Sequence, residues 1–201
     1  MRLLVVTAVA AERDAVIEAV PAGQVLVGGI GSAAAAAATS RQLAAERYDA
    51  VVSAGIAGGF DIPLGTVVVA SRIVAADLGR ETADGFEPIG TTCLDVPTEL
   101  VTAFAAPTRA ITGIVLTVST VTGTAATAAA LRARYPDAVA EAMEGFGVAT
   151  AAALHGVPFA EVRAISNLVG PRDRPSWRIP EALAALTEAF AAITAITEEP
   201  L

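Results

Sequence analysis

The stretch Ala50-Val51-Val52-Ser53-Ala54-Gly55-Ile56-Ala57-Gly58-Gly59 decides the fold class of this chain. Its first half, Ala50–Ala54, is an almost uninterrupted apolar run, which predicts a strand that is buried on both faces of a sheet. The second half is rich in glycine, which favours a tight loop directly after the strand. In α/β sheets, ligands bind beyond the carboxyl ends of the strands, so a loop at this place is a candidate site.

Runs of the same kind recur along the whole sequence. Strands are predicted at Leu3–Thr7, Gln24–Gly28, Ala50–Ala54, Thr66–Ala75, Ile111–Ser119, Ala138–Met143 and Phe159–Ser166. Helices are predicted at Ala10–Val20, Ser32–Arg47, Thr98–Ala105, Thr124–Arg134, Gly145–Leu154 and Pro180–Ile196. Strands that alternate with helices predict a three-layer α/β/α fold with a central mixed sheet. No linker or repeat interrupts the pattern, so we expect residues 1–201 to form a single domain.

The composition excludes several classes of protein. The chain is 54% hydrophobic, but much of this is alanine, and its two long uncharged stretches, 19–40 and 110–131, are broken by glycine or threonine. Neither stretch has the strongly apolar character of a membrane-spanning helix. Met1 is not followed by a signal-peptide pattern, so we expect a soluble cytoplasmic protein. The formal charge of −8 disfavours nucleic acids and anionic membranes as partners.

The residues that are absent limit the chemistry further. All 13 basic residues are arginine, which rules out a lysine Schiff base and a phosphate-binding P-loop lysine. His155 is the only histidine and Cys93 the only cysteine, so a multi-histidine or cysteine-based metal site is excluded. We therefore expect no metal, and chemistry carried mainly by carboxylates, amides, hydroxyls and backbone groups.

Three polar residues follow predicted strands. Glu12 comes after the first strand, Glu144 after Ala138–Met143 and Asn167 after Phe159–Ser166. Each has an ordinary explanation, because acidic residues favour the first turn of a helix and asparagine is a common helix cap. It is their combination, in this order and spacing, that indicates a shared site.

That combination resembles the nucleoside phosphorylase and nucleosidase superfamily, especially the branch of methylthioadenosine/S-adenosylhomocysteine nucleosidases. The matching motifs, which span nearly the whole chain, are Val27-Gly28-Gly29-Ile30-Gly31, Ala54-Gly55-Ile56-Ala57-Gly58-Gly59, Met143-Glu144 and Arg163-Ala164-Ile165-Ser166. The resemblance implies a nucleoside phosphorylase-like fold, a purine nucleoside as the small-molecule partner, a homodimer or higher homo-oligomer, and no metal or organic cofactor.

The loop after the first strand bears on the type of reaction. Phosphorylases of this superfamily hold phosphate there with a glycine and an arginine, whereas this chain has Glu12, as the nucleosidases do. A carboxylate repels phosphate and can instead deprotonate a water molecule, so we expect hydrolysis. Arg13 next to it is able to pair with an anion, and phosphorolysis therefore stays an alternative.

The resemblance also implies roles for individual residues. Glu12 would activate the water that attacks C1′, and Glu144 would bind the ribose hydroxyls and stabilise an oxocarbenium-like sugar. Asn167 would lie near N7 of the leaving purine. Further substrate contacts are expected from Ile30, Ile56, Ala57, Gly58, Val121, Thr122 and Met143.

Asn167 is a departure from the adenine-cleaving nucleosidases, which have an aspartate there. The amide of an asparagine can donate to N7 and to a 6-oxo group, which suits hypoxanthine. The segment Ser166-Asn167-Leu168-Val169-Gly170-Pro171-Arg172-Asp173-Arg174 followed by Trp177 resembles the futalosine hydrolase family of the alternative menaquinone pathway. Members of that family release hypoxanthine and leave dehypoxanthine futalosine.

Futalosine carries an aromatic carboxylate at its 5′ end. Arg172, Arg174 and Trp177 would suit that arm through charge pairing and stacking. Besides phosphorolysis, the sequence leaves two hypotheses open. One is a methylthioadenosine/S-adenosylhomocysteine-type nucleosidase with an unusual Asn167, and the second is a nucleoside-binding protein without activity.

Overall fold

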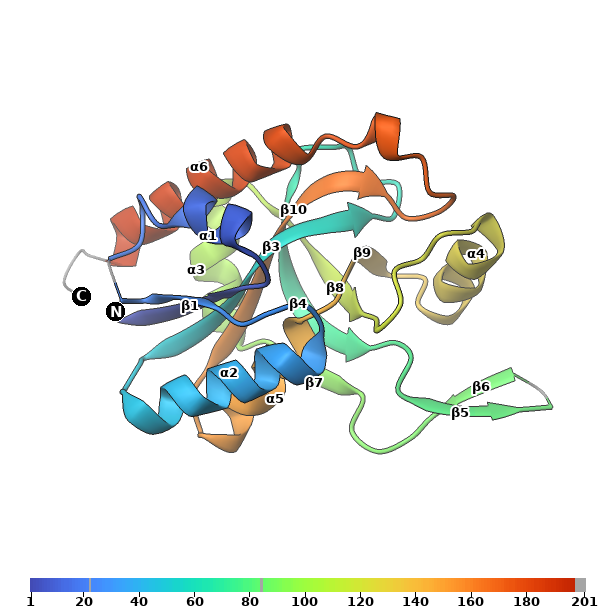
Figure 1. Cartoon of the computed structure of the whole chain (residues 1–201), viewed down its shortest axis with the longest axis horizontal. Helices are drawn as coiled ribbons and strands as arrows, with labels where there is room; N and C mark the ends of the chain where they lie inside the picture. Colours follow the sequence, from blue (N-terminus) through green and yellow to red (C-terminus); the bar gives the residue numbers. More distant parts are fainter. Residues whose placement is uncertain (22, 84, 198–201) are drawn as a thin grey trace.

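The computed structural model describes residues 1–21, 23–83 and 85–197 (Figure 1). The strands are β1 (Leu3–Thr7), β2 (Val25–Val27), β3 (Ala50–Gly59), β4 (Val67–Ala75), β5 (Gly79–Thr82), β6 (Gly85–Pro88), β7 (Cys93–Asp95), β8 (Ile111–Thr117), β9 (Ala138–Ala142) and β10 (Phe159–Leu168). The helices are α1 (Ala10–Val16), α2 (Ser32–Ala45), α3 (Thr98–Thr108), α4 (Ala125–Arg134), α5 (Gly145–Leu154), the 3-10 helix η1 (Arg174–Ser176) and α6 (Ile179–Thr197).

A mixed sheet forms the middle layer, with strands in the order β10-β4-β8-β9-β3-β1-β2 and β7 paired to β4. Strand β10 also pairs with β3, so β3, β10, β4, β8 and β9 close into a ring. Helices α1 and α6 cover one face, and α2 and α5 cover the other (Figure 1). The three-layer fold with a mixed central sheet is therefore confirmed.

The apolar runs form strands because both faces of the sheet are covered. All five residues of β1 are buried, and so are the first eight of β10. Helix α6 is apolar and long enough, by length and composition alone, to cross a membrane. Its side chains Leu186, Phe190 and Ile193 are fully buried in the core, one turn or so apart. This spacing is that of an amphipathic helix that packs on a sheet.

Small residues bring α2 and α5 into close contact. A Cβ atom on Gly147 would lie only 2.1 Å from the carbonyl oxygen of Ser32, so only glycine fits at this position. The contact places the N-terminus of α2 beside the N-terminus of α5. As a result, the backbone at Gly31 comes within hydrogen-bond distance of Glu144, 113 residues later.

The ends of two strands, β3 and β10, differ from the sequence prediction near the candidate site. Strand β3 does not end at Ala54 but continues to Gly59, because β10 pairs with it along its length and β9 pairs with Gly58 and Gly59. The glycine-rich segment is therefore strand and not loop. Strand β10 likewise runs on to Leu168, so Asn167 is part of a strand and is no helix cap.

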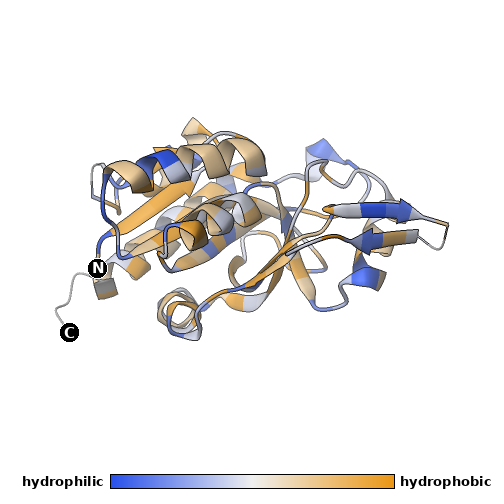
Figure 2. Cartoon of the chain, turned by 90° about the horizontal axis from the view of Figure 1, so that it is seen from below, coloured by the Kyte–Doolittle hydropathy of each residue, from blue (hydrophilic) through white to orange (hydrophobic). Residues whose placement is uncertain are grey.

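Three short strands, β5, β6 and β7, lie outside the predicted set. Strands β5 and β6 form a separate two-stranded sheet that extends away from the body of the molecule, with hydrophilic residues along it (Figure 2). Arg80 and Glu87 form an ion pair across this hairpin, and the guanidinium of Arg134 lies 4.1 Å from the ring centre of Phe86. Both strands of the hairpin are largely exposed, so they lack the apolar run on which the prediction depends.

Candidate active site

A cavity of about 340 Å³ opens where the loops after β1, β2, β8 and β9 meet β3 and β10. The structure brings nearly all of the predicted site residues together here. The lining includes Glu12, Ile30, Ile56, Ala57, Gly58, Val121, Thr122, Met143, Glu144, Asn167, Arg172 and Trp177. Arg174 is the one predicted site residue that lies outside this lining.

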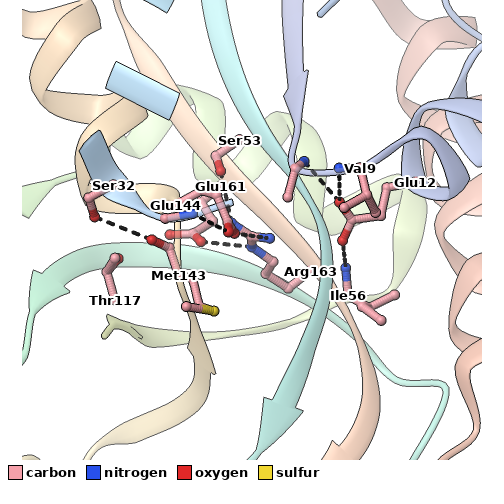
Figure 3. Close-up of polar contacts among 12 residues, drawn as sticks. Val9, Glu12, Ser32, Ser53, Ile56, Thr117, Met143, Glu144, Glu161 and Arg163 are labelled. Carbon is pink, nitrogen blue, oxygen red and sulfur yellow. Dashed lines mark hydrogen bonds and ion pairs between the residues drawn. The ribbon is translucent and has the colours of Figure 1, made fainter. Parts of the chain in front are cut away.

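Glu12 lies in the first turn of α1 and is held by three backbone amides (Figure 3). Its Oε2 accepts from the amides of Ala8 at 2.9 Å and Val9 at 3.3 Å, and its Oε1 accepts from Ile56 at 2.9 Å. The residue is only 4% exposed. A Cβ at position 55 would lie 2.3 Å from Oε1, which explains why Gly55 stands there. The carboxylate is thus fixed in one orientation at the cavity wall.

Glu144 lies at the N-terminus of α5, on another side of the same cavity. Its Oε1 accepts from the amide of Gly31 at 3.1 Å, and its Oε2 lies 3.4 Å from Nη1 of Arg163. The neighbouring carbonyl of Met143 accepts from the hydroxyl of Ser32. Two buried carboxylates, Glu12 and Glu144, therefore face one cavity from different parts of the chain.

Arg163 is fully buried beside Glu144 and Glu161 (Figure 3). Its Nε donates to Oε1 of Glu161 at 2.8 Å and its Nη2 donates to Oγ of Ser53 at 2.9 Å. Burial opposes the charge of Arg163, but Glu161, Glu144 and Glu12 together raise its pKa. A buried cation thus stands among three carboxylates, which keeps it ionised and fixes Glu144 in place.

Glu161 is the most enclosed member of this group. Burial raises the pKa of its carboxyl, while Arg163 acts in the opposite direction. Its Oε2 has no hydrogen-bond partner among the described residues. A Cβ at position 145 would lie 2.1 Å from that oxygen, so Gly145 is required where α5 begins above it.

Asn167 lies on β10 with its amide above Gly58. Its Oδ1 accepts from the hydroxyl of Ser166 at 2.8 Å, and its Nδ2 donates to the carbonyl of Leu168 at 3.1 Å. An amide nitrogen carries two hydrogens, so one donor position stays free for a ligand in the cavity.

Glu141 is a further carboxylate in the lining, and the sequence prediction does not single it out. It is buried and accepts two hydrogen bonds from Thr122, one from the amide at 2.9 Å and one from Oγ1 at 2.5 Å. Burial raises the pKa of Glu141, and the Thr122 hydrogen bonds act against that effect. Sequence reasoning misses this residue because it lies inside the predicted strand Ala138–Met143. An acidic residue within an apolar run is the signal that points to it.

Aromatic and basic side chains form the outer edge of the cavity. The guanidinium of Arg172 lies 5.6 Å from the ring centre of Trp177, and that of Arg174 lies 5.8 Å from it. Both distances are within the range of cation–π contacts. Arg174 therefore lies next to Trp177, which lines the cavity, without lining the cavity itself.

Arg13 is the residue for which the sequence left phosphorolysis as an alternative. Its guanidinium pairs with the carboxylate of Asp14 at 2.6 Å. This exposed pair is separate from the hydrogen bonds of Glu12. Among residues 1–21, 23–83 and 85–197, no group of three or more His, Cys, Asp and Glu side chains is placed to hold a metal ion.

Comparison with known proteins identifies the family of this chain. The family model of the phosphorylase superfamily matches residues 13–199. Futalosine hydrolase of Streptomyces coelicolor is 54% identical, in an alignment that covers 98% of this chain and 97% of that protein. Futalosine hydrolase of Acidothermus cellulolyticus is 46% identical and is aligned over 97% of this chain and 91% of its own.

The fold also has solved counterparts. The 5′-methylthioadenosine/S-adenosylhomocysteine nucleosidase of Neisseria meningitidis, in complex with methylthio-immucillin-A, superimposes with a TM-score of 0.83. That match covers 95% of this chain and 97% of the other at 21% identity, so it bears on the fold alone. From these matches, the chain belongs to the phosphorylase superfamily and, within it, to the futalosine hydrolase family of N-glycosyl hydrolases.

Proposed function

We propose that this chain hydrolyses the N-glycosidic bond of futalosine and releases hypoxanthine and dehypoxanthine futalosine. The observation that carries the proposal is the fixed, buried carboxylate of Glu12 at the cavity wall, opposite Glu144, in a chain 54% identical to a futalosine hydrolase. A glycosidic bond to a purine breaks with positive charge on the sugar and negative charge on the base. Both ends of that charge separation have a matching group in the cavity.

Glu12 is assigned to the water. Its backbone hydrogen bonds use three acceptor positions, and a carboxylate has about four, so one remains for a water molecule. As the water attacks C1′ and the C1′–N9 bond breaks, Glu12 accepts the proton of the water and the purine keeps the electron pair.

Glu144 is assigned to the sugar. The amide of Gly31 and the guanidinium of Arg163 hold its carboxylate in place, which leaves acceptor positions for the ribose hydroxyls. Its negative charge is buried, where it acts strongly on an oxocarbenium-like sugar. Met143 supplies an apolar contact for the sugar face.

Asn167 is assigned to the base, and the outer edge of the cavity to the 5′ arm. The free amide hydrogen of Asn167 is placed to stabilise charge on N7 or O6 of the leaving hypoxanthine. Trp177 offers a ring for the aromatic part of the arm. Arg172, with Arg174 behind it, offers positive charge for its carboxylate.

A direct measurement distinguishes hydrolysis from phosphorolysis. We expect the protein to release hypoxanthine from futalosine at the same rate with and without inorganic phosphate, because the carboxylate of Glu12 disfavours an anion next to C1′. Liquid chromatography of the free base and of the sugar product makes the test, with inosine and methylthioadenosine as comparison substrates. A rate that rises with phosphate and yields a sugar 1-phosphate would show phosphorolysis instead.

The base preference is expected to depend on Asn167. In the Asn167→Asp variant, an ionised carboxylate opposes the lone pairs of O6 and N7, while a 6-amino group can donate to it. The ratio of kcat/KM for futalosine over its 6-amino analogue should therefore fall by well over about tenfold. An unchanged ratio would show that Asn167 only joins strand to loop and that another group selects the base.

Futalosine is an intermediate of the alternative menaquinone pathway, so we place the chain in menaquinone biosynthesis. We also propose a cytoplasmic location and, as the family resemblance implies, a homodimer or higher homo-oligomer. Size-exclusion chromatography with light scattering would measure the assembly.

A further inference from the structure

Glu141 and Asn167 stand in one row across three neighbouring strands. Gly58 of β3 pairs with Glu141 of β9 on one side and with Asn167 of β10 on the other. Neighbouring strands lie about 4.8 Å apart, so the backbones of Glu141 and Asn167 are separated by roughly 10 Å. Paired residues project from the same face of a sheet, and all three residues line the cavity.

The row leaves room for a flat ring between the two polar side chains. Gly58 has no side chain, and a Cβ there would lie 2.9 Å from Cγ2 of Val169 and 3.2 Å from Nδ2 of Asn167. Any other residue would thus press on the Asn167 amide and fill the middle of the row. The glycine keeps this part of the cavity floor open for a planar base.

The two polar side chains differ in hydrogen-bonding character. Asn167 keeps one free amide hydrogen, as described above, and is a donor toward the cavity. Glu141 has used two acceptor positions on Thr122, and an ionised carboxylate has about four. Glu141 is therefore an acceptor toward the cavity. It shares no hydrogen bond with Glu12, Glu144 or Arg163 among the contacts of the described residues, so the chemistry at C1′ leaves it unused.

This donor and acceptor pair matches one kind of purine edge. A 6-oxopurine presents an acceptor, O6, next to a donor, N1–H, whereas a 6-aminopurine presents a donor, the amino group, next to an acceptor, N1. We propose that Glu141 is a specificity-determining residue that accepts a hydrogen bond from N1–H of a 6-oxopurine while Asn167 donates to O6 or N7. This inference rests on the proposed function, whose substrate class it explains.

The same arrangement rejects the 6-amino class. A bound 6-aminopurine would place its N1 lone pair against the carboxylate of Glu141, and its amino group would meet the donor of Asn167. Specificity is built in this way when a site repels the wrong ligand as well as attracting the right one. A site made to hydrogen-bond a particular polar edge discriminates strongly, because its own groups are left unpaired by the wrong ligand.

The Glu141→Gln variant tests the inference. Glutamine has the same shape and can still bond to Thr122, but it offers an amide in place of a pure acceptor. We expect kcat/KM for futalosine to fall at least about tenfold while kcat/KM for 6-amino-6-deoxyfutalosine stays or rises. The control is Glu87→Gln, which removes a carboxylate from the exposed hairpin and should leave both values unchanged. Equal losses of kcat/KM for both substrates would overturn the inference and show that Glu141 only holds Thr122 in place.

A binding measurement separates this inference from the proposed function. Calorimetry of hypoxanthine, 1-methylhypoxanthine and adenine needs no catalysis. The wild type should bind hypoxanthine at least about tenfold more tightly than the other two bases, and Glu141→Gln should lose most of that preference. If the wild type does not cleave futalosine, the proposed function fails, yet the base preferences still decide the role of Glu141. Equal binding of hypoxanthine and 1-methylhypoxanthine by the wild type would overturn that role.

Discussion

Replacing Glu12 by glutamine is expected to lower kcat for futalosine by about 10²–10⁴-fold and to leave substrate affinity within a modest factor. Glutamine fills the same space and keeps an oxygen for the amide of Ile56, but it does not accept the proton of a water molecule. Single-turnover kinetics give the rate of bond cleavage, and calorimetry on the inactive variant gives the affinity. Asp14→Asn, which removes an exposed charge two residues further along α1, is the matched control and should stay active.

A near-normal kcat in Glu12→Gln would contradict the role of Glu12 in activating water. The carboxylate would then serve only to hold the loop after β1 against β3. In that case a loss of stability without a loss of kcat would be observed, and thermal unfolding would detect it.

Removal of the Glu144 side chain should affect both binding and rate. In Glu144→Ala the ribose hydroxyls lose their acceptor, and the developing positive charge on the sugar loses a buried partner. We expect KM to rise and kcat to fall by about 10²-fold or more, because contacts that strengthen in the transition state act on kcat. Steady-state kinetics with futalosine measure both. A rise in KM alone would mean that Glu144 binds substrate and transition state equally.

Much of the fold could be predicted from the sequence because the buried elements carry strong patterns. The run Leu3–Thr7 and the helix Gly145–Leu154 have the predicted boundaries. Strand β3 is longer than predicted, since its glycine-rich half has no apolar pattern and becomes strand only through backbone pairing with β9 and β10. Tertiary pairing of this kind is not encoded in local propensity.

The site residues also divide into those with a local sequence signal and those without one. Glu12, Glu144 and Asn167 could be chosen because each follows an apolar run and matches a family motif, and the structure places all three at one cavity. Glu141, Glu161 and Arg163 lie within strands, where the local pattern treats them as part of the sheet. Only the register of the strands shows that Glu141 lies in the row that faces the cavity, and only the fold brings Arg163 to Glu144.

The pairing of Glu161 with Arg163 has a consequence for how the protein assembles. These two residues are next-but-one neighbours on β10, so their side chains point to the same face and their opposite charges meet within one strand. A lone buried charge would oppose the docking of that strand by several kcal/mol, whereas a local pair enters the interior already compensated. By contrast, Glu144 gains its contact with Gly31, and Oε1 of Glu12 gains its contact with Ile56, only when segments distant in the chain have docked. We therefore expect β10 to join the growing sheet early, and the reactive groups to be placed in the last steps of folding.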